Sequence, residues 1–272
     1  MKSQEFTDEA LAELYNFVRC QRADGTFYGT SGQCRKGTPA EPKERKEKKA
    51  KKSLRERFEE TGGVNGGAYG DVAITKEGTV IKKGRLGQDE IKVQEEMAKA
   101  GLAPKVLDSE WTAKKPDNAG PRMGIMEMEL AKGSSYEEIQ GSLNDKQKAQ
   151  AADEYLRIQG EMHKRGIAHG DFHEQNFFFD PETGKGAAID FGLSQRSPVE
   201  VIAEATGNQG LWGRGDWITR TDSPRVALFD ERRRAVVADM DSKGLRTPSG
   251  RISKNMTAKQ VDDYIKQLYG DS

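Results

Sequence analysis

The stretch that decides the fold reads IAHGDFHEQNFFFDPETGKGAAIDFGLS and spans residues 167–194. Two apolar runs, 177–179 and 187–189, flank a Pro-Glu-Thr-Gly-Lys turn, which is typical of a β-hairpin. Asn176 precedes the first run and Asp190 follows the second, so the hairpin brings both residues to the same end. An amide oxygen and a carboxylate, completed by phosphate and water oxygens, suit Mg²⁺. The stretch therefore predicts a magnesium site held by these two residues.

A third acidic or amide side chain precedes the hairpin. Asp171 lies five residues before Asn176, on a loop where it can orient a hydroxyl group for attack. His169 and His173 are four residues apart and could bind zinc from a helix, but Gly170 and the β-like run after them argue against a helix. The zinc-protease order His-Glu-x-x-His is also absent. We interpret His169 as a residue that packs beneath the loop.

The pair of motifs, His-x-Asp-x-x-x-x-Asn followed by Asp-Phe-Gly, resembles the catalytic loop and metal loop of the protein-kinase-like superfamily. The resemblance covers about residues 61–195. It implies a bilobal α+β fold, with a small antiparallel β-sheet and one helix in the N-lobe and a mainly helical C-lobe. It also implies phosphoryl transfer from ATP to a hydroxyl group, with Asp171 as the catalytic base and Asn176 and Asp190 as ligands of Mg²⁺.

The segment upstream of the first expected strand resembles the later part of a kinase glycine-rich loop, whose backbone N–H groups can cradle phosphates. Asn65 stands at the first glycine position of that pattern, and a flexible turn is the alternative interpretation. The resemblance assigns nucleotide contacts to Gly67, Ala68, Tyr69, Gly70 and Val72.

The strand that follows, Thr79-Val80-Ile81-Lys82, resembles the Val-Ala-Ile-Lys strand of kinases. Val80 and Lys82 share one face of a strand, so Val80 is expected to cover the adenine and Lys82 to reach the phosphates. A shift of one residue, to Lys83, stays open.

An acidic partner for Lys82 is expected on the helix predicted over residues 88–100. Glu90 is our first choice because Val93 and Met97 follow on the same face; Glu95 or Glu96 are the alternatives.

Residues 124–133, GIMEMELAKG, resemble the fifth strand and hinge of a kinase. This predicts Met126 as the gatekeeper, with Glu127 and Met128 offering backbone groups to adenine. An ordinary core strand is the alternative, since methionine often fills cores.

The loop sequence His-Gly-Asp-Phe-x-Glu-x-Asn is most similar to RIO-type atypical protein kinases. Aminoglycoside and related small-molecule phosphotransferases also use His-Gly-Asp, often with histidine at the position of His173. The chain lacks the His-Arg-Asp arginine of typical eukaryotic protein kinases, and no Ala-Pro-Glu follows Gly192. We interpret the chain as an atypical serine/threonine kinase with a protein substrate. The alternatives are a phosphotransferase of the aminoglycoside or choline kinase type, and a nucleotide-binding regulatory pseudokinase.

Composition sets the remaining expectations. The 272 residues include 44 basic and 44 acidic side chains, and a net charge of zero argues against bulk nucleic-acid binding. Only the basic segment 43–57 is a candidate nucleic-acid contact, with a solvated linker as the favoured interpretation. There is no apolar run long enough for a membrane span, no secretion signal and no disulfide framework, so a cytoplasmic protein is expected. We divide the chain into an N-terminal appendage (1–60), an N-lobe (61–132) and a C-lobe (133–272).

Overall fold

The computed structural model describes residues 20–21, 27–28, 52–62, 70–86, 89–111, 122–207, 215–247 and 250–270. Two compact units are distinguished, Met1–Ala50 and Lys51–Ser272. In the first unit, the described residues form two short antiparallel strands, β1 (Cys20–Gln21) and β2 (Phe27–Tyr28). Apolar residues at helical spacing after Thr7 predict a helix there, and this segment lies outside the described residues.

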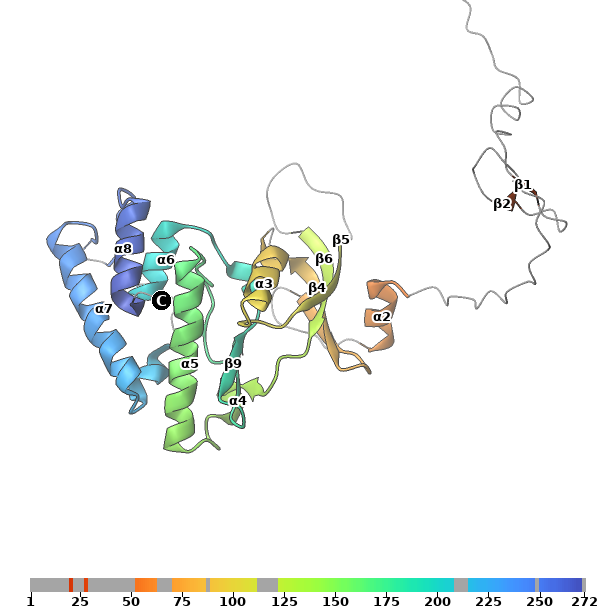
Figure 1. Cartoon of the computed structure of the whole chain (residues 1–272), viewed down its shortest axis with the longest axis horizontal. Helices are drawn as coiled ribbons and strands as arrows, with labels where there is room; N and C mark the ends of the chain where they lie inside the picture. Colours follow the sequence, from red (N-terminus) through yellow and green to blue (C-terminus); the bar gives the residue numbers. More distant parts are fainter. Residues whose placement is uncertain are drawn as a thin grey trace, which may run out of the picture. The chain divides into compact units, whose positions relative to one another are not determined.

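The second unit begins with a four-stranded antiparallel sheet in the order β3-β4-β6-β5 (Figure 1). Helix α3 (Glu90–Lys99) connects β4 to β5 and corresponds to the helix predicted over residues 88–100. The strands are β3 (Gly70–Ile74), β4 (Thr79–Leu86), β5 (Val106–Trp111) and β6 (Arg122–Glu129). This is the small antiparallel sheet with one crossing helix that we expected of an N-lobe.

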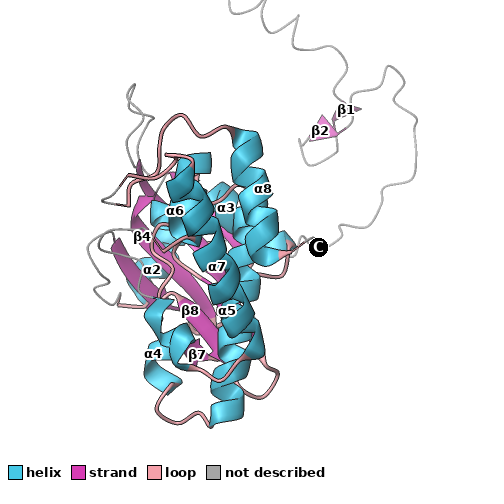
Figure 2. Ribbon diagram, turned by 90° about the vertical axis from the view of Figure 1, so that its left-hand side faces the viewer, coloured by secondary structure: helices cyan, strands magenta, loops and turns pink. Residues whose placement is uncertain are grey.

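Helices dominate the rest of the chain, and a small sheet, β7-β8-β9, packs against them (Figure 2). Its strands are β7 (Ser134–Ser135), β8 (Phe177–Asp180) and β9 (Lys185–Ala188), so the predicted hairpin forms. The helices are α4 (Tyr136–Ile139), α5 (Asp145–Lys164), α6 (Pro198–Ala205), α7 (Pro224–Ser242) and α8 (Ala258–Tyr269), with 3₁₀ turns η1 (Phe191–Leu193) and η2 (Gly215–Arg220). The α+β bilobal architecture is therefore confirmed.

Local sequence signals set the ends of these helices. Asn144 and Gln147 form a capping box at α5, and Thr257 and Gln260 form another at α8, each with the three-residue spacing that is typical of this motif. Ser223 caps α7, with proline at the first helical position. Each cap satisfies backbone N–H groups that the first turn of a helix leaves without partners.

One hydrophobic cluster joins the two lobes. It contains Val93 and Met97 of α3 together with Tyr155 of α5 and Phe177 of β8. The backbone N–H of Ala188 on β9 also donates to the carbonyl of Leu102, 2.8 Å away. The end of the hairpin is therefore tied directly to the segment that leaves α3.

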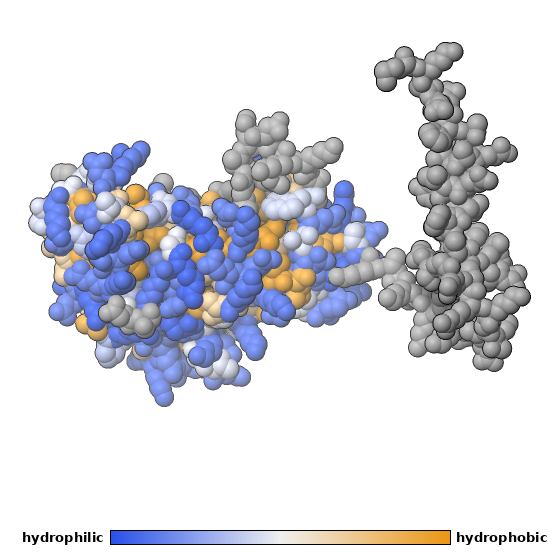
Figure 3. Space-filling model, turned by 45° about the horizontal axis from the view of Figure 1, so that its top comes forward, coloured by the Kyte–Doolittle hydropathy of each residue, from blue (hydrophilic) through white to orange (hydrophobic). Residues whose placement is uncertain are grey.

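The surface is mostly polar. In Figure 3, hydrophilic side chains dominate the visible face and apolar patches lie between them, as expected for a chain with 32% charged residues. None of the helices in the described part of the chain has the length and apolar character needed to cross a membrane.

The boundary that we predicted at residue 60 needs a correction. Residues 54–60 form helix α2 (Leu54–Glu60), whose Leu54 and Phe58 pack against Ala73 and Ile81 of the sheet. Arg57 also forms an ion pair with the carboxylate of Glu127 on β6. The charge-rich composition hid two apolar residues at helical spacing, and the helix belongs to the N-lobe.

This packing predicts different outcomes for two truncations. Removal of residues 1–50 should leave the melting temperature and ATP affinity nearly unchanged, because α2 stays in place. Removal of residues 1–62 should lower the melting temperature by roughly 5–10 °C, since the sheet loses a buried Leu and Phe worth about 3 kcal/mol. Thermal unfolding of both variants checks this. Equal destabilisation would mean that the first 50 residues also support the fold.

Candidate active site

Three of the predicted residues meet where the two lobes join. Lys82 Nζ lies 2.6 Å from Glu90 Oε1 and 2.7 Å from Asp190 Oδ1. Lys82 comes from β4, Glu90 is the first residue of α3, and Asp190 follows β9. Glu90 and the Lys82 side chain are almost fully buried. One cation thus links the sheet, the helix and the hairpin.

The charge of Lys82 is maintained despite burial. Desolvation disfavours the ammonium, but the carboxylates of Glu90 and Asp190 outweigh it and raise the pKa of Lys82. Burial likewise opposes the charge of Asp190, and the Lys82 ammonium outweighs it and lowers the pKa of that carboxyl. Lys82 and Asp190 therefore each favour the charged form of the other.

The sequence left open whether Lys82 or Lys83 reaches the acidic side chains. The two residues lie on opposite faces of β4, and Lys82 is the one that contacts Glu90. Lys83 points to the other face of the sheet, where its Nζ lies 5.0 Å from the centre of the Phe58 ring. It packs over an aromatic ring of α2. The other helix glutamates also lie elsewhere: Glu96 pairs with Arg196, and Glu95 is exposed.

The backbone at Asp190 is unusual. Its φ of 60° and ψ of 66° place it in the left-handed region, where it is the one non-glycine residue in the described part of the chain. Phe191, which follows, is buried against the ring of His169, with 4.8 Å between ring centres. This packing holds the backbone in a costly conformation that aims the carboxylate at Lys82.

The loop that carries Asp171 depends on the preceding glycine. Gly170 has a φ of 81°, and a Cβ placed there would lie 2.4 Å from the carbonyl oxygen of Leu193. Its backbone N–H donates to Glu204 Oε2 at 2.9 Å. No other residue fits at this position without displacing the chain.

Asp171 and Asn176 lie side by side. The Asn176 amide nitrogen donates to the backbone carbonyl of Asp171 at 2.8 Å and lies 3.2 Å from Asp171 Oδ2. Asp171 Oδ1 is buried without a hydrogen-bond partner; His173 Nε2 lies 3.3 Å away but lacks hydrogen-bond geometry. Burial raises the pKa of Asp171 against the opposing effect of His173. This carboxylate oxygen thus has no hydrogen-bond partner among the described residues, and His173 is its ion-pair neighbour.

His169 lies beneath this loop, as we interpreted. Its Nε2 lies 3.0 Å from the carbonyl of Ile189, and its Nδ1 accepts from the backbone N–H of Asp171 at 3.3 Å. Complete burial lowers the pKa of His169, which favours the neutral imidazole. The side chain joins the catalytic loop to the strand that ends at Asp190.

Valines line the same side of the sheet as Lys82. Val72 pairs directly with Lys82 across β3 and β4, and Val80 lies two residues before it, so their side chains share a face. Val72 remains 38% exposed. Gly70 opens β3, whereas Gly67, Ala68 and Tyr69 lie outside the described residues.

Sequence reasoning missed Phe178. Phe177 and Phe179 are fully buried in the core, and alternation along β8 turns Phe178 to the opposite side, where it is half-buried. The signal was present in the run of three phenylalanines, because a strand cannot bury consecutive residues on one face.

The predicted hinge needs a correction of register. Met128 pairs with Val80 of β4 and Val106 of β5, and Glu127 pairs with residues on both sides as well. Their backbone groups are therefore taken up by the sheet, and the Glu127 side chain bonds to Arg57 and Thr79. The strand continues to Glu129, so free backbone begins at Leu130.

Met126 also does not lie beside the expected adenine position, where a gatekeeper was predicted. It lies opposite Lys82 and is almost fully buried, whereas Met128 lies opposite Val80. The residue beside the expected adenine position is thus Met128. The longer strand explains the shift of two residues.

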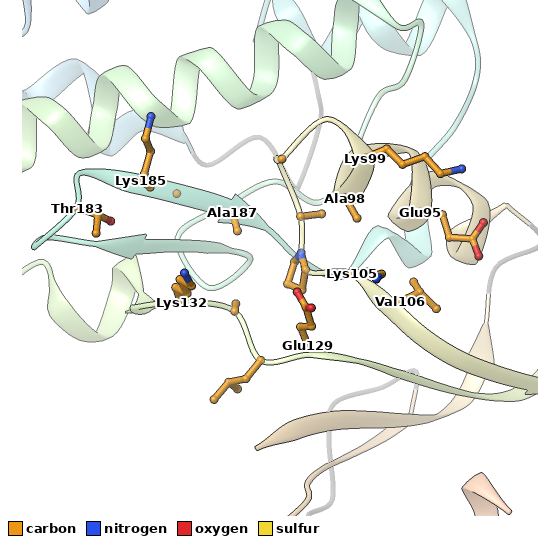
Figure 4. A pocket seen from close by; sticks show the side chains of 16 residues that line it. Glu95, Ala98, Lys99, Lys105, Val106, Glu129, Lys132, Thr183, Lys185 and Ala187 are labelled. Carbon is orange, nitrogen blue, oxygen red and sulfur yellow. The ribbon is translucent and has the colours of Figure 1, made fainter. Parts of the chain in front are cut away.

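A cavity of about 810 Å³ lies against the segment after β6, between the end of α3 and strand β9 (Figure 4). It shares no lining residue with the Lys82 cluster or the catalytic loop. Charged side chains around it are Glu95, Lys99, Lys105, Glu129, Lys132 and Lys185. The cavity therefore lies apart from the Lys82 cluster and the catalytic loop, but Leu130, where the free backbone after β6 begins, is one of its lining residues.

Comparison with known families adds one finding. Residues 136–201, about a quarter of the chain, match the model of the phosphotransferase enzyme family. The matched region includes the catalytic loop, the hairpin and Asp190. The match supports the protein-kinase-like superfamily and indicates a phosphotransferase enzyme. A comparison with curated proteins gave no match for the chain.

Proposed function

We propose that this protein is an ATP- and Mg²⁺-dependent phosphotransferase of the atypical, RIO-like kinase type, which transfers the terminal phosphoryl group of ATP to a serine or threonine hydroxyl of a protein. The observation that carries the proposal is the charged cluster of Lys82, Glu90 and Asp190 beside the loop of Asp171 and Asn176. These five side chains come from segments separated by about a hundred residues, and the Ile189 N–H, next to Asp190, donates to the carbonyl of Asn176 at 3.0 Å.

The donor set fits a magnesium ion. Asn176 uses its amide nitrogen on the Asp171 carbonyl, which turns its amide oxygen away from that contact, and Asp190 offers a carboxylate. In the described part of the chain, no three His, Cys, Asp or Glu side chains are grouped as metal ligands. Two protein ligands completed by phosphate and water are typical of Mg²⁺, which when bound would neutralise charge on the phosphates.

The remaining roles follow from charge and placement. Lys82, held by Glu90, binds the phosphate chain, and Val72 and Val80 cover the base, with Gly67, Ala68, Tyr69 and Gly70 around the phosphates. Phe178, half-buried on β8, and Met128 and Leu130 at the end of β6 are further candidates for contact with the base. Asp171 accepts or orients the hydroxyl proton through its unpartnered Oδ1. Catalysis then consists of positioning and electrostatic stabilisation.

Adjacent lysines provide a test of the nucleotide site. Lys82→Met should lower transfer about 10- to 100-fold, because one phosphate-binding cation is lost from a buried site. Lys83→Met should change transfer less than about 2-fold, since Lys83 lies on the other face of the sheet. Transfer of labelled phosphate from ATP, per folded molecule, gives both values. The opposite ranking would contradict the site.

The family match supports a second candidate, a small-molecule phosphotransferase with the same residues in the same roles. Incubation with labelled ATP and Mg²⁺ separates the two. Label on serine or threonine of the protein itself or of added proteins supports the kinase. Label confined to hydroxylated small molecules, such as aminoglycosides or choline, supports the second candidate. Nucleotide binding without any transfer would contradict both.

A further inference from the structure

We propose that Glu204 positions the catalytic loop and that Tyr269, from the C-terminal helix, holds Glu204 in place through His163. This inference rests on the proposed function for its activity readout, but its structural basis does not. The three residues come from α6, α8 and α5, and none of them touches the Lys82 cluster. Glu204 is 34 residues from the loop glycine that it binds, so the link arises only in the folded chain.

The first contact is between Glu204 and the loop. Glu204 Oε2 accepts the backbone N–H of Gly170 at 2.9 Å, directly beside Asp171. Gly170 is in the left-handed conformation, and its N–H direction sets the path of the chain into Asp171. A carboxylate that accepts a backbone N–H makes a stronger bond than a neutral acceptor does. Glu204 thus fixes the residue before the proposed base.

The second contact sets the direction of the hydrogen bonds. Glu204 Oε1 lies 3.1 Å from His163 Nε2. Burial opposes the charge of Glu204, but the hydrogen bond and charge of His163, together with His169 and the Gly170 N–H, outweigh it and lower the pKa of Glu204 to about 2. An ionised carboxylate only accepts, so Nε2 carries the proton and donates.

The third contact reaches the end of the chain. His163 Nδ1 lies 2.9 Å from the Tyr269 hydroxyl. A tyrosine hydroxyl and an imidazole nitrogen can each donate or accept, so this contact is a hydrogen bond for either form of the ring. Gln159 Oε1, at 3.3 Å, is the more distant acceptor for the same hydroxyl. The relay runs from Tyr269 through His163 and Glu204 to the Gly170 N–H.

The packing around Tyr269 leaves little freedom. A Cβ added at Gly160 of α5 would lie 2.6 Å from the Tyr269 ring. The ring also packs on Phe229 of α7, with ring centres 5.2 Å apart. Because residue 160 is glycine, the Tyr269 ring in the last turn of α8 has room to pack against α5. The Tyr269 hydroxyl then points to His163.

The key experiment compares two tyrosines of the same helix. Tyr269→Phe keeps the ring but loses the hydroxyl, and we expect kcat per folded molecule to fall roughly 5-fold, the effect of one lost neutral hydrogen bond. ATP affinity should change by less than about 2-fold, because no nucleotide contact is altered. Tyr264→Phe is the matched control: its hydroxyl donates to Asp239 Oδ2 at 2.6 Å, away from the loop. It should leave kcat unchanged.

Two substitutions of Glu204 separate positioning from general stability. Glu204→Ala leaves the Gly170 N–H and His163 without a partner, and kcat should fall roughly 10- to 100-fold. Glu204→Gln can still accept from Gly170 and donate to His163 in its other tautomer, so it should restore most of the activity. A residue with only a structural role would lower the melting temperature in both variants without this difference in kcat per folded molecule.

Hydrogen exchange tests the relay without any catalysis. The amide of Gly170 should exchange faster in Tyr269→Phe and Glu204→Ala than in wild type, and at the wild-type rate in Tyr264→Phe. Gly160→Ala, which displaces the ring without removing a relay atom, should behave like Tyr269→Phe. Unchanged exchange at Gly170 in Tyr269→Phe, or equal kcat in the two tyrosine variants, would overturn the inference. Absence of transfer in wild type would contradict the proposed function alone.

Discussion

Replacement of Asp190 by Asn should lower phosphoryl transfer by about 10³-fold or more. The change removes the charge of a proposed metal ligand, and metal-ion catalysis is worth several kcal/mol of transition-state stabilisation. Asn is the suitable substitution because Asp190 has a φ of 60°, which Asn tolerates better than Ala does. Transfer from labelled ATP and the Mg²⁺ dependence of ATP binding should both be measured.

The control for Asp190 lies on the same hairpin. Asp180, at the end of β8, accepts hydrogen bonds from the turn and does not contact Lys82. Asp180→Asn should retain at least about half of the wild-type transfer, as a surface change away from the site usually does. If Asp190→Asn keeps the Mg²⁺ dependence and rate of wild type, Asp190 is not a metal ligand.

Asp171→Asn is expected to lower transfer by about 10²- to 10⁴-fold, the usual contribution of a general base. The side chain keeps its size and can still contact Asn176, but it can no longer accept the hydroxyl proton. ATP affinity should change little, because Lys82, Asn176 and Asp190 are intact. ATP affinity and transfer should be measured side by side on the same preparation.

The neighbouring Glu174 offers a matched carboxylate on the same loop. Glu174→Gln should leave transfer within about 3-fold of wild type, because no role in proton transfer falls to it. Retained transfer with normal ATP affinity in Asp171→Asn would falsify the assignment of the base. Loss of both properties, with a lower melting temperature, would identify Asp171 as a structural residue.

Local signals in the sequence were sufficient for the secondary structure that frames the site. The capping boxes at Asn144 and Thr257 act within four residues, so spacing alone predicts where α5 and α8 begin. The hairpin between Asn176 and Asp190 follows from two apolar runs around a turn. The same spacing argument proposed the residues that the structure brings together around Lys82.

Sequence reasoning failed where the outcome depends on long-range pairing. The hinge lies two residues later than predicted because β6 pairs with strands on both sides as far as Met128. No local sequence pattern indicates how many residues of two strands pair. Helix α2 was assigned to the appendage because charged residues surround Leu54 and Phe58, whose partners lie far along the chain. Phe178 could have been recognised from strand alternation.

By itself, the sequence determined the order of the motifs and the start of the capped helices, because motifs and helix caps depend on neighbours along the chain. Only the tertiary structure decided that Lys82 faces Glu90 and Asp190 while Lys83 faces Phe58. It also decided that Glu204 accepts from Gly170 and that Tyr269 contacts His163. Buried charges and orphan N–H groups need partners, and the fold supplies them from segments that no local spacing connects.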